Sequence, residues 1–218
     1  MKSATPPSEY RLSLSWGAAV FLLAIAIRAL AMLEIQSVPA LIKPTNDGAR
    51  YHEQAALLAS GQWPFAGAFY QSPAYPFFEA GLYKVFGPDP PVVLRAQIVL
   101  GALSALLLAL ATAHLFGPAA GFTAGICYAL YGPGILWDLG YQKTSLAQFL
   151  QCLALWLVVR HAMKGRGGNA RDMISALVLG IALGLMSITR ETLLPIALAV
   201  PVLLLWHGRR RGRNAGIV

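Results

Sequence analysis

The sequence predicts an all-α protein, a multi-pass transmembrane helical bundle of about six spans. Of its 218 residues, 57% are hydrophobic and only 12% are charged, and the mean hydropathy is +0.59. Several apolar stretches approach or exceed the ~20 residues that a helix needs to cross the hydrocarbon core of a bilayer. This composition indicates a membrane protein and not a soluble domain.

The six predicted spans follow one another with one long interruption. The first begins after Lys2 and Arg11, which also fits a signal peptide, but the apolar run continues past Arg28 without a clear cleavage site. We therefore expect an uncleaved first span. The last span is short, and Pro201 is expected to bend it. The predicted spans are residues 13–33, 92–115, 118–136, 141–159, 173–189 and 192–206.

The positions of the cations predict the orientation of the chain. The net charge is +8, but the basic runs directly follow apolar stretches, which argues against nucleic-acid binding and for cytoplasmic loops. With the N-terminus in the cytoplasm, ten of the seventeen Lys and Arg lie inside and seven of the nine acids outside. We expect a single membrane domain, residues 1–218, in the plasma (inner) membrane, with a cytoplasmic tail (1–12), a first extracytoplasmic loop (34–91) and a basic cytoplasmic tail (207–218).

The extracytoplasmic loop is long enough to carry structure of its own. Tyr51, Ala55 and Leu58 recur at helical spacing and Gly61 supplies a stop, so residues 48–60 are predicted to form a short helix. A second helix is predicted at 76–86, in a stretch where aromatic residues and prolines alternate. Both are too short to span, and aromatic side chains favour the headgroup level, so both are expected to lie at the outer interface.

The polar residues of this loop raise two interpretations of Asp47. Its carboxylate stands at the start of the first short helix, where it could cap free backbone N–H groups. It could also act as a general base facing a cleft at the membrane surface, and the two roles are compatible. His52 has no partner at ligand spacing, and Cys127 and Cys152 lie in apolar segments without a CxxC pattern, so no metal site is expected. Arg28, inside the first span, is expected to snorkel outward or to pair with Glu34.

Four segments resemble one family of membrane enzymes. Asp47, Arg50, Tyr51 and Glu53 form a D-x-x-R-Y-x-E pattern that is followed by G-x-W at 61–63. Further along the chain, in the family's order, come "SPAYPFFEAGLYKVFG", "LRAQIVLGALSALLL" and "ITRETLLP". The set resembles the GT-C glycosyltransferases, in particular the bacterial lipid A aminoarabinose transferase and the protein O-mannosyltransferase superfamily. The resemblance covers about 40–206, and because family members are about twice as long, we expect the N-terminal part of a longer GT-C module.

The resemblance implies inverting transfer of a sugar from a polyprenyl-phosphate donor to a glycan, lipid or protein acceptor on the extracytoplasmic face. Asp47 matches the catalytic Asp of the family and would be the general base. Arg50 is a candidate for binding substrate or phosphate, although its spacing of three residues from Asp47 favours an ion pair that orients the carboxylate. Tyr51 and Glu53, from the same motif, are candidates for substrate binding. No cofactor is expected beyond the lipid-linked donor, which is a substrate, and the membrane lipids are the other expected partners.

The departing phosphate requires cations. The candidates are the outer-side residues Lys84, Arg95, Lys143 and Arg190, although each could instead bind lipid headgroups, and Arg190 could pair with Glu191. Many relatives carry a second acid just before the fourth span, where this chain has Lys143 and Thr144. Either Asp138 substitutes for that acid or the role is lost in this chain. The alternative function is that of a non-catalytic membrane carrier, a lipid flippase or an accessory subunit.

Overall fold

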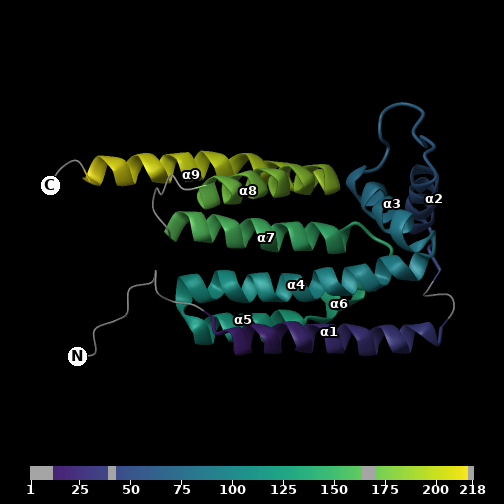
Figure 1. Ribbon diagram of the computed structural model, residues 1–218, viewed down its shortest axis with the longest axis horizontal. Helices are drawn as coiled ribbons and strands as arrows, with labels where there is room; N and C mark the ends of the chain where they lie inside the picture. The colour runs from purple at the N-terminus through teal and green to yellow at the C-terminus, as the bar shows by residue number, and fades with distance from the viewer. Residues whose placement is uncertain (1–11, 39–42, 164–169, 216–218) are drawn as a thin grey trace.

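The computed structural model describes residues 12–38, 43–163 and 170–215, and this part of the chain forms helices and loops without a strand. The all-α prediction is therefore confirmed. The longest helices lie side by side, and a pair of shorter helices crosses one end of the bundle (Figure 1). The elements are α1 (Leu14–Gln36), α2 (Asp47–Ala59), α3 (Ala74–Phe86), α4 (Pro90–Phe116), α5 (Pro118–Ala129), α6 (Gly132–Asp138), α7 (Thr144–Met163), α8 (Ala170–Thr189), the 3-10 turn η2 (Glu191–Leu193) and α9 (Leu194–Ala215).

Four of the described helices are long and apolar enough to cross a membrane, namely α1, α4, α7 and α8. The predicted third span is divided into α5 and α6, which are bent by 58° at a short break, and the pair makes a fifth span if it is counted as one. The apolar part of the last helix, Glu191–Trp206, is shorter than the others. The structure thus supports four to five spans, and the expected number of about six is not confirmed.

Small residues allow the first helices to pack closely. A Cβ atom at Gly125 would lie 2.8 Å from both Ala109 of α4 and Val20 of α1, and one at Gly121 would lie 2.5 Å from the backbone oxygen of Ala109. Glycine and alanine at such positions let helix backbones approach, which is how helices associate where no water is available to drive burial. A separate apolar cluster joins α7, α8 and α9.

The broken span is held by a buried ion pair. Arg28 of α1 is fully buried, and its Nε lies 2.7 Å from Oδ2 of Asp138 at the end of α6. The same guanidinium donates to the backbone oxygen of Ala129, the last residue of α5, at 3.3 Å. The expectation that Arg28 snorkels outward or pairs with Glu34 was wrong. The break between α5 and α6 leaves backbone oxygens without intrahelical donors inside the bundle. These oxygens and the buried carboxylate of Asp138 make the inward position of the Arg28 guanidinium favourable.

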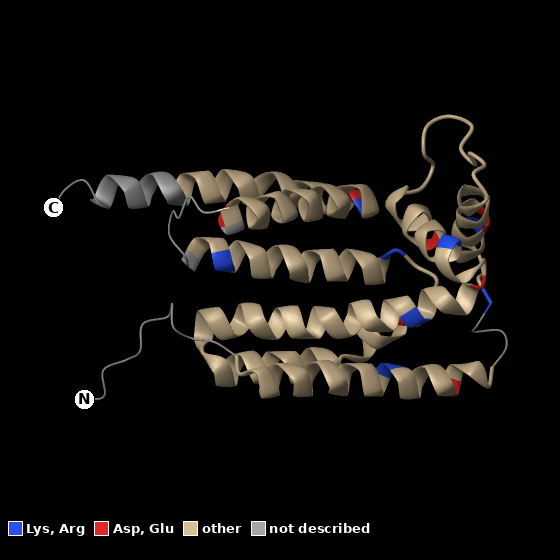
Figure 2. Cartoon of the chain, viewed as in Figure 1, with Lys and Arg blue, Asp and Glu red and all other residues tan. Residues whose placement is uncertain are grey.

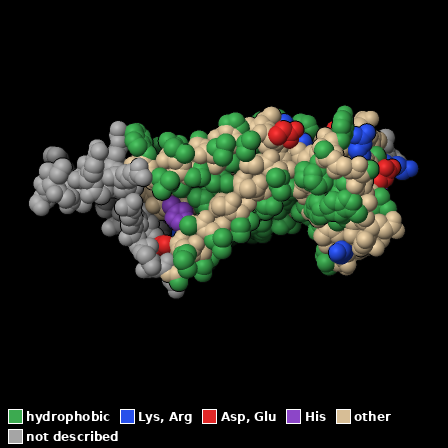
Figure 3. All heavy atoms as spheres, turned by 90° about the horizontal axis from the view of Figure 1, so that it is seen from above, with side chains coloured by type: hydrophobic (Ala, Val, Ile, Leu, Met, Phe, Trp, Pro, Cys, Tyr) green, Lys and Arg blue, Asp and Glu red, His purple; other side chains and the backbone are tan. Residues whose placement is uncertain are grey.

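Helices α2 and α3 lie across the end of the bundle where α1 ends and α4 begins (Figure 1). The charged side chains of the described residues gather at this end, whereas the long helices carry few (Figure 2). A space-filling view shows apolar side chains along the body of the bundle and charged ones around α2 and α3 (Figure 3). The two short helices predicted at 48–60 and 76–86 are confirmed as helices, and their place at the membrane interface stays a prediction.

Candidate functional site

Asp47 is held at the start of α2 by unusual local geometry. The N-cap position belongs to Asn46, whose side chain makes no capping bond, so the expected capping role of Asp47 is not what the structure shows. Asp47 lies instead in the first turn, where the helix dipole still favours a negative charge. Asn46 has a φ of 49°, which is uncommon for a residue other than glycine. Gly48 contacts Tyr141 so closely that a Cβ atom there would lie 2.8 Å from the Tyr141 Cβ.

Two sets of hydrogen bonds, made by the neighbouring residues Gln71 and Ser72, connect Asp47 and residues far away in the sequence to the same short segment. Gln71 donates from Nε2 to Oδ1 of Asp47 at 2.8 Å. The next residue, Ser72, donates to Oε2 of Glu191 at 2.8 Å and accepts a bond of 2.8 Å from Nζ of Lys143. Lys143 also lies 3.8 Å from Glu191. We call Asp47, Gln71, Ser72, Lys143 and Glu191 the polar network.

The network joins four segments that are separated in the chain. Asp47 comes from α2, Gln71 and Ser72 from the loop before α3, Lys143 from the turn before α7, and Glu191 from the turn between α8 and α9. The segment from Asp138 to Lys143 is fixed to α4, because Gln97 of that helix donates to the backbone oxygens of Asp138 and Gly140 at 3.0 and 2.8 Å. The arrangement therefore depends on the whole bundle and not on one loop.

Charges in the network act on one another. The pKa of Glu191 is lowered by hydrogen bonds from its own backbone amide and from Ser72, and by the charge of Lys143. Burial, followed by the negative charges of Asp47 and Glu191, raises the pKa of Tyr51 to about 12. Tyr51 therefore keeps its proton at neutral pH and lies within electrostatic range of both acids, where its hydroxyl can donate a hydrogen bond but cannot serve as a base.

Arg50 and Glu53 of the D-x-x-R-Y-x-E pattern, and His52 within it, make their contacts away from Asp47. The Arg50 guanidinium stacks over the ring of Tyr70 at 5.2 Å, and the described ion pairs do not include one between Arg50 and Asp47. Glu53 is exposed on α2. His52 bonds through Nδ1 to the hydroxyl of Tyr83 at 2.9 Å, so it has a packing partner within the loop.

Among the predicted phosphate-binding cations, the structure brings one into the network. Lys143 is part of it, and Arg190 lies exposed beside Glu191, whose ionic partner is Lys143 and not its neighbour. Lys84 is exposed in the last turn of α3, and Arg95 is exposed on α4. The hydrogen bonds and ion pairs of the described residues do not connect Lys84 or Arg95 to Asp47.

Asp138 is engaged elsewhere. Its side chain is buried, with one oxygen bonded to Arg28 and the other accepting from Ser145 at 2.6 Å. In this structure Asp138 therefore stabilises the break of the span. Sequence reasoning did not find Gln71, Ser72 or the part played by Glu191. A polar Gln-Ser pair within an aromatic, apolar stretch was the available signal.

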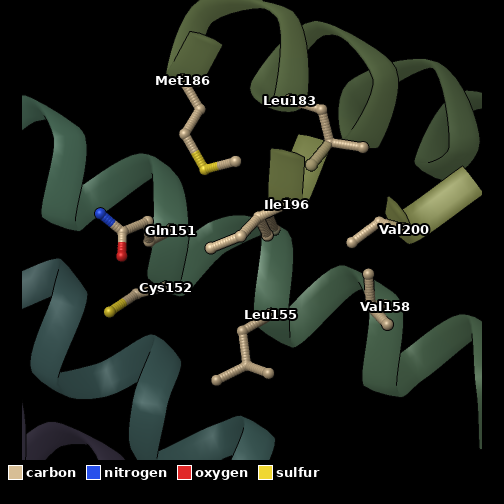
Figure 4. Close-up of a pocket in the computed structure, with 9 residues that line it drawn as sticks. Gln151, Cys152, Leu155, Val158, Leu183, Met186, Ile196 and Val200 are labelled. Carbon is tan, nitrogen blue, oxygen red and sulfur yellow. The ribbon is translucent and has the colours of Figure 1, made fainter. Parts of the chain in front are cut away.

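An apolar groove is lined by residues close in sequence to members of the network. It has a volume of about 480 Å³ and is lined by residues from the loop before α3, from α3, α7 and α8. A second cavity of about 330 Å³ lies between α7, α8 and α9 (Figure 4). Among the described residues, no group of three or more His, Cys, Asp and Glu could hold a metal ion.

Comparison with known proteins supports a family assignment. The profile of the family described as dolichyl-phosphate-mannose-protein mannosyltransferase matches residues 70–217, which is more than half of the chain. The matched region contains Gln71, Ser72, Lys143 and Glu191 and begins after Asp47. No curated protein and no solved structure matches the chain. The chain belongs to the dolichyl-phosphate-mannose-protein mannosyltransferase family, a family of membrane glycosyltransferases of the GT-C type.

Proposed function

We propose that the protein is an integral-membrane glycosyltransferase that moves a sugar from a polyprenyl-phosphate donor to an acceptor on the extracytoplasmic face. The observation that carries this proposal is the polar network, in which a carboxylate that can accept a proton is linked through Gln71 and Ser72 to the ammonium group of Lys143. Transfer from a lipid phosphate requires these two functions, a base for the acceptor and a cation for the leaving group.

In the proposed reaction, Asp47 acts as general base. Oδ1 is occupied by the bond from Gln71, which fixes the orientation of the carboxylate, so Oδ2 is the oxygen that receives the proton of the acceptor hydroxyl. The acceptor oxygen attacks the anomeric carbon from the side opposite the phosphate. The bond between that carbon and the phosphate oxygen breaks, its electron pair leaves with the polyprenyl phosphate, and the configuration at the carbon is inverted.

Lys143 stabilises the departing phosphate. It is half-buried at the start of α7, so its charge is less screened by water than that of an exposed lysine. Arg190 is exposed at the neighbouring turn and is the second candidate for this role. Because Glu191 already partners Lys143, a bound phosphate would compete with this carboxylate, and Lys143 would turn from one anion toward the other.

The first test is the substitution Asp47→Asn in the full chain, assayed with a panel of polyprenyl-phosphate sugars in membranes. Removal of a general base lowers turnover by about a hundredfold or more, whereas donor binding should stay within twofold because the amide keeps the shape of the side chain. The matched control is Glu34→Gln, which alters an exposed carboxylate at the end of α1. Full transfer by Asp47→Asn would contradict the role of Asp47 as general base, whereas absence of transfer by the wild type with every donor would favour a carrier or flippase built from the same helices.

A further inference from the structure

Gln97 of α4 fixes the segment from Asp138 to Lys143, and the other end of its amide is bonded as well. Its Nε2 donates to the backbone oxygens of Asp138 and Gly140, and its Oε1 accepts from the hydroxyl of Tyr75 at 2.6 Å. Gln97 and Tyr75 are both fully buried. Because the amide donates on one side and accepts on the other, the bond from Tyr75 stabilises the orientation in which Nε2 meets the segment.

The position of Lys143 depends on this segment. Lys143 follows Gly140 by three residues, and its ammonium group enters the polar network through its bond to Ser72. The backbone N–H of Gln142 donates to the oxygen of Gly140 at 2.8 Å, so this oxygen accepts from Gln97 and also closes the turn before α7. Loss of the Gln97 bond would therefore loosen the backbone that presents the ammonium group.

A carboxyl group that the proposed mechanism does not use lies beside Tyr75. Glu79 follows Tyr75 by about one turn of α3 and has no exposed surface. Neither of its oxygens has a hydrogen-bond partner among the described residues. Burial, followed by the nearby Glu79 carboxyl, raises the pKa of Tyr75. The two side chains therefore interact, although the structure directs the Tyr75 proton to Gln97.

The surroundings of Glu79 are tyrosines and neutral groups. The other ionisable side chains near it are Tyr51 of α2, Tyr83 of α3 and Tyr141 of the segment before α7. Burial is the largest cause that raises the pKa of each of these hydroxyls, and the Glu79 carboxylate adds to the rise. Tyr83 is bonded to His52, α4 reaches the cluster through the neutral amide of Gln97, and the ion pairs within the described ranges do not include Glu79. Burial raises the pKa of Glu79 itself to about 8.

Tyr75 has one proton to donate, and two acceptors compete for it. While Glu79 is protonated it is a neutral acceptor, and the bond goes to Gln97, as observed. Once Glu79 is ionised, its carboxylate is the stronger acceptor, because a hydrogen bond to a charged group is about twice as strong as one between neutral groups. The Tyr75 proton then turns to Glu79, and Oε1 of Gln97 stays buried without its donor.

We propose that Glu79 is a positioning residue of the transferase, which keeps Lys143 in place while it carries its proton and releases it when the proton is lost. Glu79 acts through Tyr75 and Gln97 and does not touch the substrate. This inference rests on the proposed function and deepens it, because it gives the reaction an alkaline limit. A general base such as Asp47 stays active once it is ionised, so a fall in rate at alkaline pH is expected from Glu79 and not from the base.

The first measurement is the rate of sugar transfer from pH 6 to 9.5, with the full chain in membranes and saturating donor. The wild-type rate should fall about tenfold around a midpoint of about 8, which corresponds to ~1.4 kcal/mol, the scale of one hydrogen bond. Glu79→Gln is neutral at every pH and should remove the fall. Tyr75→Phe cannot donate to Gln97 and should show the low rate at every pH. The control Glu34→Gln, at an exposed position, should follow the wild type.

The second measurement does not require turnover. Hydrogen–deuterium exchange, corrected for the intrinsic effect of pH on amide exchange, reports the opening of residues 138–143. Exchange of this segment should rise between pH 7 and 9 by the same factor in the wild type, and it should not rise in Glu79→Gln. Peptides from α1 should exchange equally in both proteins, which separates local loosening from unfolding.

The outcomes separate this proposal from the proposed function. If sugar is transferred but the rate does not fall with pH, or falls equally in Glu79→Gln, the role of Glu79 is overturned and the transferase stands. Exchange at 138–143 that is the same in wild type and Glu79→Gln at pH 9 would also overturn it. If this exchange depends on Glu79 but no donor gives transfer, the link from Glu79 to Lys143 stands and the enzymatic function fails.

Discussion

Glu79 is a carboxyl group without exposed surface on α3, at the polar end of the molecule. Neither of its oxygens has a hydrogen-bond partner within the described part of the chain. The nearby Tyr75 hydroxyl donates to Gln97 at 2.6 Å instead, and Tyr83 is bonded to His52. Burial raises the pKa of Glu79 to about 8, and the proximity of Tyr75 offsets only part of this rise. Glu79 is therefore mostly protonated at neutral pH.

The raised pKa of Glu79 leads us to predict that the free energy of unfolding depends on pH. The folded protein holds the Glu79 proton up to pH of about 8, while the unfolded chain releases it near its ordinary value of 4.5. The native state thus binds more protons between these values, and its stability falls as the pH rises through this window, by an amount on the order of 5 kcal/mol at ~1.4 kcal/mol per pKa unit. Glu79→Gln should remove this loss.

The measurement is thermal unfolding in detergent from pH 4 to 10, for wild type, Glu79→Gln and the exposed control Glu34→Gln. Glu79→Gln should match the wild type near pH 4 and should unfold at a clearly higher temperature at pH 9. A difference between the two proteins that does not change with pH would mean that Glu79 ionises as readily in the folded state as in the unfolded one.

Single residues also show where sequence reasoning stops. The short helix with Asp47 near its start could be predicted from the spacing of apolar residues and from helix-breaking residues. The predicted start, residue 48, was one residue late. Asn46 occupies the N-cap position with a positive φ, which the sequence pattern does not indicate. The partner of Asp47 could not be predicted, because Gln71 is 24 residues away and the loop between them has no periodicity. Contacts of this kind follow from packing and not from local sequence.

Among the elements, the broken span shows the effect of proline and glycine on an apolar run. The sequence predicted one span over 118–136, and the structure divides it after Ala129. Pro133 lies in the first turn of α6, where its missing N–H costs nothing, and it could not continue α5 without a clash. The break leaves backbone oxygens that need donors, and Arg28 supplies one to Ala129. The sequence "YGPG" at 131–134 indicated a possible break, but it did not indicate that Arg28 of α1 would donate to the freed backbone oxygen.

The pair formed by Arg28 and Asp138 predicts a strong effect on stability. Arg28→Met leaves a buried carboxylate and a backbone oxygen without their donor, so the free energy of unfolding should fall by about 3–5 kcal/mol. The double variant Arg28→Met with Asp138→Leu should recover part of this loss because no charge stays buried alone. Unfolding in increasing sodium dodecyl sulfate would compare these proteins with Leu30→Met, an exposed position on α1. Wild-type stability in the single variant would refute a structural role for the pair.

At the scale of the whole molecule, the strongest prediction from sequence was the distribution of charge. Helix α1 begins, and α9 ends, at the end of the bundle opposite α2 and α3, as the positions of the basic runs required (Figure 1). The end that carries the polar network could be predicted in this way because charge and hydropathy are read directly from the sequence, and its extracytoplasmic location stays a prediction. The way the network assembles from four segments could not, since it needs the positions of α4, α7 and α8 relative to one another.

The proposed orientation can be tested directly. In a chain with Cys127 and Cys152 replaced by alanine, Ser60→Cys places a thiol after α2, and Phe116→Cys places one at the opposite end of α4. Both native side chains are exposed. A membrane-impermeant maleimide added to intact cells should label Ser60→Cys only, and permeabilisation should be needed to label Phe116→Cys. The reverse pattern would place the polar network in the cytoplasm and remove the basis for an extracytoplasmic reaction.

The ion pair that secures the broken span also has a consequence for biogenesis. Arg28 and Asp138 are 110 residues apart in the chain, so at a synthesis rate of about 5–20 residues per second the guanidinium emerges some 5–20 seconds before its carboxylate. A lone arginine in the middle of a bilayer is costly. We therefore expect the first helix to stay beside the insertion machinery until the third predicted span arrives, so that the helices from α1 to α6 are released into lipid together.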